Sequence, residues 1–539
     1  MKNLKNRVIE ILESRGKETV KTLADLPPIN SLLNVVPATK FLAKLLRQGK
    51  RVLIVGDYDA DGIMATSILY SFLIEIGFTK EFVNYIIPSR LVDGYGLSKN
   101  IIEYALDEEY EVIVTVDNGI AATEAIAYAK EKGLIVIITD HHTAPAILPN
   151  ADYIVNPKQP GETFPFIDIS GATVAWYFVA ALREVFDAQI DIRKYLDFVA
   201  ITVVSDVMPL SNINVAILNY GLAKIKRRER YVYSLLWNDW SIPTINETSL
   251  GFALVPMINA IGRIADANVG VELFLSKDIE FIENTFEYVQ GVNEDRKAMT
   301  RGFLENAEEM MQLDFDVTQK VIIVRNKDYH EGIVGIIAGK LAEIYKKPAY
   351  VFSWNEKKEI WKGSARSTGE IHLYNLTNLA KEYILGFGGH KGAVGLAVTE
   401  DNWDSFKETM EKNALLIPEE DFLDSSKETI LSSIEDFDLD LLNTISSYGP
   451  FGEANPPLLF ETEVSVKVEK ELKGGLHYKC RVISENGVTL TALFFNVKKH
   501  IFLEQVKADK VRISFTPTRN YNAKTKEFGF DLFCNVIND

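Results

Sequence analysis

Three aspartates stand at alternate positions just after an apolar run near the start of this 539-residue chain. The run 53–55 ends in a glycine and is followed by Asp57, Asp59 and Asp61. Three carboxylates packed this closely repel one another unless a cation lies between them, and hard divalent metals are the usual cation. The apolar stretch 63–70 is typical of a buried helix. We therefore expect the acids at the carboxyl end of a strand, where open α/β sheets bind ligands.

Two other interpretations of this stretch have to be weighed against a metal site. A calcium loop of the D-x-D-x-D-G kind needs a bidentate Glu six positions after its glycine, where this chain has Ile68. Such a loop also needs a helix in front of it, where this chain has a strand pattern. The second alternative is a solvated acidic turn, and the rest of the chain has to show whether further metal-type residues accompany these acids.

Further metal-type side chains follow later apolar runs of the same region. Asp117 comes after the run 112–116, and Asp206 comes after a helical pattern. His141 and His142 follow the run 134–138, next to another acid, and they are two of only seven histidines in the chain. One aspartate after a strand is usually a turn former, but four such sites together predict a metal centre. Carboxylates with imidazole suit two Mn²⁺ or Mg²⁺ ions rather than a thiolate zinc site.

Two such ions could perform phosphoryl chemistry. Metals about 3.5–4 Å apart hold a phosphoryl group and lower the pKa of a bridging water, which then attacks phosphorus in line. Asp117 is the candidate to bridge both ions, and His142 is the candidate non-ligand that polarises the phosphate. The alternative for His142 is a histidine satisfied within the core.

The length of the chain calls for several domains to position these residues. A chain of 539 residues is too long for one core, so two to four domains are expected. Strand and helix patterns alternate between 51 and 156, which predicts a mostly parallel sheet, and a long amphipathic helix is expected over 270–313. Five short strand patterns after 448 predict a small barrel of the oligonucleotide-binding type. The expected domains are a helical lead-in (1–48), an α/β domain (49–230), a helical region with the connector helix (231–315), a second α/β domain (316–415), an acidic linker (416–447) and the barrel (448–539).

Composition and charge narrow the class of protein. The formal net charge is −17, but acidic residues concentrate in 400–440 and a basic excess lies in 320–391, so nucleic acid is not excluded as a partner. No apolar run approaches the roughly 18 residues of a membrane span, and the N-terminus lacks the apolar centre of a signal peptide. Two cysteines, Cys480 and Cys534, cannot build a disulfide framework. We expect a cytoplasmic protein that does not associate with membranes.

Four ordered segments of the chain resemble the motifs of the DHH phosphoesterases. The tripeptide Asp140-His141-His142 alone is a weak signal, but the ordered set is strong. Other segments are similar to the single-strand-specific 5′→3′ DNA exonucleases of this superfamily, so the likeness runs from about 50 to 400. The four motif segments are 56–62, 116–119, 140–142 and 205–206; the others are 88–90, 93–97, 258–263, 330–335, 363–366 and 388–391.

The resemblance implies roles for individual residues. The implied metal ligands are Asp59, Asp61, Asp117, His141 and Asp206. Asp57 is an additional implied ligand, because Val55 stands where simpler members of the superfamily have a His. These six residues and His142 form the implied catalytic set. Ser364 and Arg366, with Arg90, are implied to hold a terminal 5′-phosphate, since an Arg fork matches phosphate oxygens. His390 and Lys391, on a glycine-rich turn, are further substrate-binding candidates, and the alternative is a loop with solvated charges.

The resemblance also implies an activity. It is the release of 5′-mononucleotides from single-stranded DNA by two-metal hydrolysis with Mn²⁺ or Mg²⁺, in DNA repair and recombination. A single-strand-binding protein and a helicase are implied partners. The alternatives are a phosphodiesterase for short RNA or cyclic dinucleotides, a pyrophosphatase, or a non-catalytic nucleic-acid scaffold. The connector helix and the terminal barrel argue against the smaller enzymes, and the intact acids and histidines argue against the scaffold.

Overall fold

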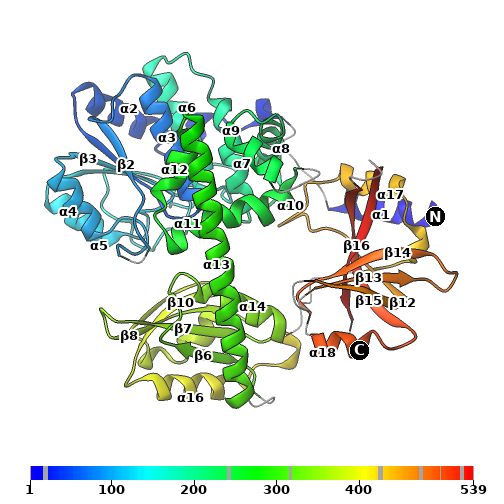
Figure 1. Cartoon of the computed structure of the whole chain (residues 1–539). Helices are drawn as coiled ribbons and strands as arrows, with labels where there is room; N and C mark the ends of the chain where they lie inside the picture. The colour runs from blue at the N-terminus through cyan, green and yellow to red at the C-terminus, as the bar shows by residue number, and fades with distance from the viewer. Residues whose placement is uncertain are drawn as a thin grey trace. The chain divides into compact units, whose positions relative to one another are not determined.

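The chain divides into two compact units in its computed structural model. One unit comprises Ile11–Glu294 with Tyr448–Pro456, and the other comprises Met1–Glu10, Asp295–Ser447 and Pro457–Asp539 (Figure 1). The residues described are 2–15, 22–90, 92–239, 245–314, 319–422, 429–472, 477–497, 499–522 and 527–537.

A parallel five-stranded sheet forms the centre of the first unit. Its strand order is β2-β1-β3-β4-β5, and every pairing is parallel, as the alternating patterns predicted. The order reverses direction at β1, which leaves β1 and β3 adjacent at the point where open α/β sheets bind ligands. The strands are β1 (Val52–Val55), β2 (Val83–Ile86), β3 (Val112–Val116), β4 (Ile135–Thr139) and β5 (Tyr153–Val155).

Helices cover both faces of this sheet. Alternate residues of β1 face opposite sides, so Leu53 packs with one buried cluster and Ile54 with the other. The cluster around Leu53 includes α4 (Lys99–Asp107) and α5 (Thr123–Glu131). The cluster around Ile54 includes α2 (Val35–Arg47), α3 (Ala60–Glu75) and α6 (Gly171–Phe186). Because α3 and α6 are apolar on most of their surface, both are buried as central helices.

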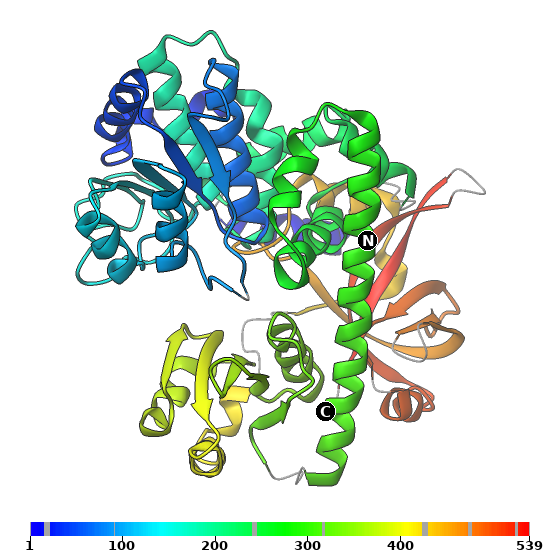
Figure 2. The same ribbon diagram turned by 60° about the vertical axis from the view of Figure 1, so that its left-hand side comes forward.

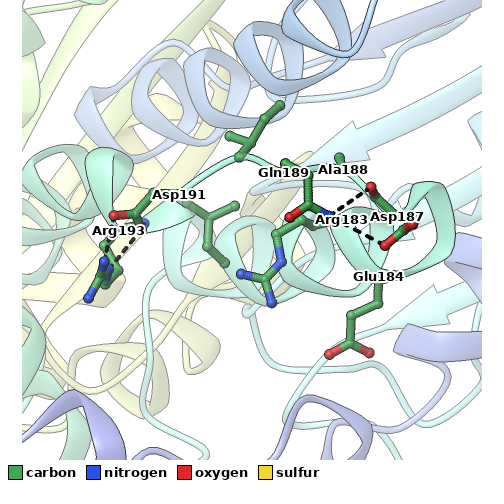
Figure 3. A pocket seen from close by; sticks show the side chains of 9 residues that line it. Arg183, Glu184, Asp187, Ala188, Gln189, Asp191 and Arg193 are labelled. Atoms are coloured by element: carbon green, nitrogen blue, oxygen red, sulfur yellow. Dashed lines mark hydrogen bonds and ion pairs between the residues drawn. The ribbon is translucent and has the colours of Figure 1, made fainter.

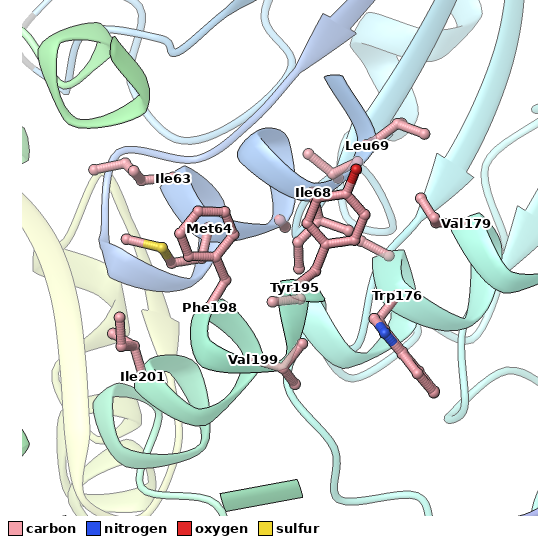
Figure 4. Packing of buried hydrophobic residues seen from close by; sticks show 14 of the residues in the cluster. Ile63, Met64, Ile68, Leu69, Trp176, Val179, Tyr195, Phe198, Val199 and Ile201 are labelled. Atoms are coloured by element: carbon pink, nitrogen blue, oxygen red, sulfur yellow. The ribbon is translucent and has the colours of Figure 1, made fainter. Parts of the chain in front are cut away.

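Further helices extend the core beyond the sheet. Phe198 and Val199 on α7 (Leu196–Ser205) pack with Ile63, Met64 and Ile68 on α3 (Figure 4). The remaining helices of this part are α8 (Asn212–Lys226), α9 (Tyr231–Asp239), α10 (Glu247–Ser249), a π-helical turn at Leu250–Leu254, α11 (Val255–Ile264) and α12 (Asn268–Leu275).

The predicted long amphipathic helix is confirmed over 279–313, but its predicted start at 270 was wrong. Helix α12 ends at Leu275, and the long α13 (Ile279–Asp314) begins after a break. Within the break, Ser276 Oγ accepts a hydrogen bond from the Asp278 N–H, and Asp278 Oδ1 accepts one from Phe281 N–H. Short polar side chains at such positions compete for backbone groups and begin a new helix.

A mixed sheet and a closed barrel form the second unit (Figure 2). The sheet order is β6-β7-β8-β10-β9, where β6 and β7 are parallel and the other pairs are antiparallel. Its strands are β6 (Ile322–Asn326), β7 (Ala349–Asn355), β8 (Ile360–Arg366), β9 (Gly386–Gly389) and β10 (Ala393–Thr399), with helices α14 (Val334–Tyr345), α15 (Leu373–Asn378) and α16 (Trp403–Ala414).

Five strands close the barrel because β12 pairs with both β13 and β15. The strands are β12 (Leu459–Leu472), β13 (His477–Ile483), β14 (Thr489–Phe494), β15 (Val511–Asn522) and β16 (Glu527–Val536), with α18 (Lys499–Gln505) between β14 and β15. The predicted five-strand barrel is confirmed. A short strand from the expected linker, β11 (Thr429–Leu431), pairs in parallel with β12 and joins that sheet. Among the described residues, no helix combines the length and apolarity that crossing a membrane requires.

Candidate metal centre and phosphate-binding residues

The turn after β1 presents the first group of acids. Asp59 begins α3 as its N-cap, and its carboxylate accepts hydrogen bonds from the backbone N–H groups of Asp61 and Gly62 at 2.9 and 3.2 Å. Asp57 is buried, and its Oδ1 has no hydrogen-bond partner. The cap therefore fixes the path of the turn while Asp57 keeps an acceptor free for a cation.

The N-terminus of α6 holds Asp61. Its two carboxylate oxygens accept hydrogen bonds from the Gly171 and Ala172 N–H groups at 2.6 and 2.8 Å. Unpaired N–H groups and the helix dipole favour an anion at this end of a helix. A side chain at position 171 would collide with the Asp117 carboxylate, so glycine is required for the close approach.

Asp117 lies in an unusual backbone conformation at the end of β3. Its φ is 62°, in the left-handed region. The next residue, Asn118, donates hydrogen bonds to the carbonyls of Val55 and Val116, both at 2.9 Å. This amide ties the ends of β1 and β3 together, and it places Asp117 beside the first acids.

His141 is the point where the acids converge. Its Nε2 lies 3.2 Å from Asp117 Oδ1, 3.2 Å from Asp206 Oδ2 and 3.7 Å from Asp61 Oδ2. The imidazole is buried, and neither of its nitrogens is aligned for a hydrogen bond. Asp206 caps the C-terminus of α7, so three separate elements deliver these side chains to one place.

The geometry fits divalent cations. Three groups of side chains could each hold an ion among the described residues: Asp57, Asp59 and Asp117; Asp61, His141 and Asp206; and Asp117, His141 and His142. Asp117 and His141 each occur in two of these groups. Buried polar atoms without partners are rare and costly, and here they include oxygens of Asp57 and Asp117 and both nitrogens of His141. Carboxylate and imidazole donors suit Mn²⁺ or Mg²⁺.

Titration behaviour agrees with a site built for positive charge. Burial, and then the neighbouring acids, raise the pKa of Asp57 and Asp117 well above the usual range and that of Asp61 to about 7. Burial alone would lower the pKa of His141, but Asp117 and Asp206 outweigh it and raise that pKa well above its usual value. Without a metal, protons therefore take the place of the cation.

His142 has a different environment from His141. Its side chain is 44% exposed, and its Nδ1 lies 2.8 Å from Asp140 Oδ1. Asp140 is buried, and its carboxylate also accepts the backbone N–H groups of His141 and Ile120 at 2.7 and 2.9 Å. Tyr95 Oη lies 3.2 Å from His142 Nε2. The sequence assigned no role to Asp140 or Tyr95, although Asp140 follows a strand in the same motif as the histidines.

Arg90 lies beside the acidic turn. Its guanidinium carbon is 5.1 Å from the centre of the Tyr58 ring, and Tyr58 stands between Asp57 and Asp59. Burial raises the pKa of Tyr58 to about 12, so its hydroxyl stays neutral. The guanidinium is thus placed next to the metal-binding turn within the first unit.

The remaining predicted site residues lie in the second unit. Arg366 on β8 donates hydrogen bonds from Nη1 to Ser364 Oγ at 2.9 Å and to the Ala365 carbonyl at 2.8 Å. A side chain at Gly335, in the first turn of α14, would meet both Ser364 and Arg366. A guanidinium, a hydroxyl and a helix N-terminus are groups that bind anions in proteins, so these residues are candidates for an anion site.

His390 and Lys391 occupy the turn between β9 and β10. Ser367 N–H donates to the Gly392 carbonyl at 3.0 Å, which brings this turn next to the end of β8. Lys391 is exposed and forms an ion pair with Glu370 at 2.5 Å. The structure thus brings the substrate-binding candidates of the second unit to one end of its sheet.

A surface hollow of about 520 Å³ lies elsewhere in the first unit, lined by residues 183–193 (Figure 3). Its Arg193 pairs with Asp191 at 2.7 Å, and its Gln189 donates to Asp187. None of the predicted site residues lines it.

The fold and the metal centre define a DHH-type protein with an associated second domain and a barrel. Family models match in this order: the DHH family N-terminal domain at 51–203, the DHHA1 domain at 318–414 and the RecJ OB domain at 431–530. The chain belongs to the RecJ family.

Curated relatives support this assignment, and a solved structure shares the fold. The chain is 31% identical to the single-stranded-DNA-specific exonuclease RecJ of Dickeya dadantii, over 89% of this chain and 87% of that protein. It is also 31% identical to the RecJ exonuclease of Bacillus subtilis over 89% of this chain, where it spans 62% of the relative's length. A crystal structure of RecJ from Thermus thermophilus in complex with Mn²⁺ matches with a TM-score of 0.77 and 24% identity, over 95% of this chain and 73% of that one.

Proposed function

We infer that this chain is a metal-dependent exonuclease specific for single-stranded DNA. The observation that carries the inference is the convergence of buried Asp and His side chains, with unpartnered ligand atoms, at the carboxyl ends of β1, β3 and β4. Relatives of this chain over most of its length are named single-stranded-DNA-specific exonucleases, which supports the substrate class.

The residues of the chain have distinct tasks in this reaction. When bound, two divalent ions supply a water of lowered pKa and neutralise charge on the reacting phosphate. Asp57, Asp59, Asp61, Asp117, His141 and Asp206 hold these ions. His142, oriented by Asp140, presents a nitrogen to a phosphate oxygen and favours the charge that develops there.

The direction of digestion follows from end recognition. We assign Ser364 and Arg366, which lie on β8 beside the first turn of α14, to a terminal 5′-phosphate. An enzyme that binds this end acts 5′→3′ and releases 5′-mononucleotides. We assign Arg90, which lies beside the acidic turn, to the terminal 5′-phosphate as well. His390 and Lys391, on the turn beside the end of β8, offer further donors to the strand. Such an activity belongs to DNA repair and recombination.

The main experiment is digestion of single strands labelled at either end, with wild-type protein and Asp117→Ala. We expect 5′-labelled mononucleotides first from the wild type with Mn²⁺. We expect at least about a 100-fold loss of rate in the variant, because a metal ligand is lost. DNA binding by the variant should persist, and circular dichroism checks its fold. Mononucleotides released first from the 3′ end, or faster hydrolysis of short RNA or cyclic dinucleotides, would reject the assignment.

A second experiment tests the terminal-phosphate site. Arg366→Lys keeps the positive charge but loses the two-pronged fork, so the preference for 5′-phosphorylated over 5′-hydroxyl strands should fall about tenfold. The preference is the ratio of kcat/KM values for the two strands. Lys407→Arg, at a half-buried ion pair on α16, serves as the control and should leave this ratio unchanged. An unchanged ratio in Arg366→Lys would remove Arg366 from the site.

We also propose that the protein is cytoplasmic and that it has protein partners. Both cysteines are free thiols, which agrees with the reducing cytoplasm. A single-strand-binding protein and a helicase are proposed partners, and co-sedimentation of the purified proteins would test each of them.

A further inference from the structure

An asparagine on α11 holds the metal-binding turn from behind. The side-chain Oδ1 of Asn259 accepts a hydrogen bond from the Ala60 N–H at 2.8 Å. Ala60 lies between Asp59 and Asp61, in the first turn of α3. The first N–H groups of a helix have no partner within the helix, so this contact satisfies a group that the Asp59 cap leaves open.

The same helix touches the turn a second time. A side chain at Gly262 would collide with the Tyr58 carbonyl oxygen, so α11 packs directly on the backbone of the turn. Asn259 and Gly262 lie three residues apart and therefore share one face of α11. This face fixes the backbone that carries Asp57, Asp59 and Asp61.

A second asparagine, on α12, holds the loop that carries Arg90. Asn268 Oδ1 accepts the Ile87 N–H at 2.9 Å, and Asn268 Nδ2 donates to the Ile87 carbonyl at 3.3 Å. Asp266 in turn accepts from the Asn268 backbone N–H and from Nδ2, at 2.9 and 2.7 Å, which fixes the orientation of the amide. Ile87 is the last residue before the segment 88–90.

We propose that Asn259 and Asn268 are positioning residues with separate tasks: Asn259 sets the geometry of the metal ligands, and Asn268 sets the position of the phosphate-binding Arg90. Both lie outside the matched DHH domain, which ends at residue 203. The segment 255–275 is thus part of the active centre, although it supplies no metal ligand.

Manganese binding tests the first task without any need for activity. Electron paramagnetic resonance titration with Mn²⁺ alone should show about a tenfold higher dissociation constant for Asn259→Ala, since residues that orient ligands typically contribute 10- to 100-fold in metal affinity. Asn259→Asp retains an acceptor for the Ala60 N–H, so it should bind Mn²⁺ at least as tightly as the wild type. Asn268→Ala should leave Mn²⁺ binding unchanged.

Binding of DNA ends tests the second task, which rests on the proposed phosphate contact of Arg90. Fluorescence anisotropy in the presence of a chelator compares 5′-phosphorylated and 5′-hydroxyl oligonucleotides of one sequence. Asn268→Ala should reduce the preference for the phosphorylated strand about tenfold, because a charge-assisted contact loses its alignment. Asn259→Ala should retain the preference.

A matched control separates positioning from general destabilisation. Asp191→Ala removes a comparable hydrogen bond, from the Arg193 N–H to Asp191 Oδ1 at 3.0 Å, in the same unit and beside the surface hollow that none of the predicted site residues lines. It should change neither measurement. Parallel changes of both measurements in Asn259→Ala and Asn268→Ala, or no change in either, would overturn the proposal. If the variants bind Mn²⁺ as described but the wild type never hydrolyses DNA, the proposed function is rejected, whereas the role of Asn259 in positioning the metal ligands still holds.

Discussion

Asp140 shows how a buried carboxylate can act through a neighbouring residue. Burial alone would raise its pKa, but the hydrogen bond from His142 and the charges of both histidines outweigh this and hold the pKa below its usual value. The carboxylate therefore stays ionised and fixes His142 through Nδ1. In the proposed mechanism a phosphate oxygen replaces the Tyr95 hydroxyl, which lies 3.2 Å from His142 Nε2.

Replacement of Asp140 by Asn should lower kcat by about 10- to 100-fold, because the charge that orients His142 is lost. KM should change little, since Asp140 contacts no substrate directly. Steady-state kinetics on a 5′-phosphorylated single strand measures both constants.

Asp152→Asn is the control for this variant. Asp152 also accepts a backbone N–H of the sheet, from Val136 at 2.8 Å, but it precedes β5 at the opposite edge. Equal losses of kcat in the two variants would mean that Asp140 only stabilises the sheet.

At the scale of elements, α7 ends in a conformation that its sequence disfavours. Val207 follows Asp206 with φ of 51°, and its side chain is 63% exposed. The N–H groups of Val207 and Met208 donate to the carbonyls of Val204 and Val203, at 3.3 and 3.0 Å, as in a Schellman cap. Glycine is usual at this position, and a β-branched residue there is strained. Asp206, the residue before this cap, has its Oδ2 3.2 Å from His141 Nε2.

Val207→Gly should stabilise the protein by about 1 kcal/mol, because glycine adopts a left-handed conformation without a steric penalty. Thermal unfolding of the metal-free protein should show the gain as a higher Tm. Val207→Ala retains most of the strain and should gain less. A lower Tm for the glycine variant would show that the valine side chain, and not the backbone, matters there.

At the scale of the whole molecule, a chain of net charge −17 has to bind a polyanion. The metal centre resolves part of this conflict, because divalent ions turn a cluster of buried acids into a positive site. The metal-free centre should therefore depend on pH. Asp61 has an ordinary pKa of 3.8 when unfolded and about 7 in the folded chain, so the folded state binds more protons between these values. The contribution of Asp61 to the stability of the metal-free protein therefore falls as pH rises from about 4 to about 7.

Removal of the metal should destabilise the first unit more at pH 7.5 than at pH 5. Mn²⁺ at about 100 times its pH 7.5 dissociation constant adds about 2.7 kcal/mol at that pH, or roughly 5 to 10 °C in Tm. The same concentration adds less at pH 5, where protons compete for the ligands. Differential scanning calorimetry of the metal-free and Mn²⁺-loaded protein at the two pH values measures both differences. A larger effect at pH 5 would contradict the raised pKa values, and Asp117→Ala should show little response to Mn²⁺ at either pH.

The sequence by itself determined the class of fold and predicted the ligand set. The β-branched runs of β1, β3 and β4 are regular enough to predict a parallel sheet, and acids directly after them have to meet at one edge of it. Local signals were weaker elsewhere. The polar residues Ser276 and Asp278 separate α12 from α13, where one helix was expected. The strand β11 lies in the expected linker and pairs with β12 of the barrel.

Tertiary structure alone decided which residues orient the centre. Asn259 and Asn268 follow the first acids by about two hundred positions, and only the packing of α11 and α12 brings them to the turns that they hold. Asp140 was visible in the sequence, but its bond to His142 depends on the path of the chain after β4. Residue types specify which side chains can bind a metal, whereas contacts between segments distant in sequence specify how those side chains are held. The reason is that hydrogen bonds of this kind form only after the elements have packed.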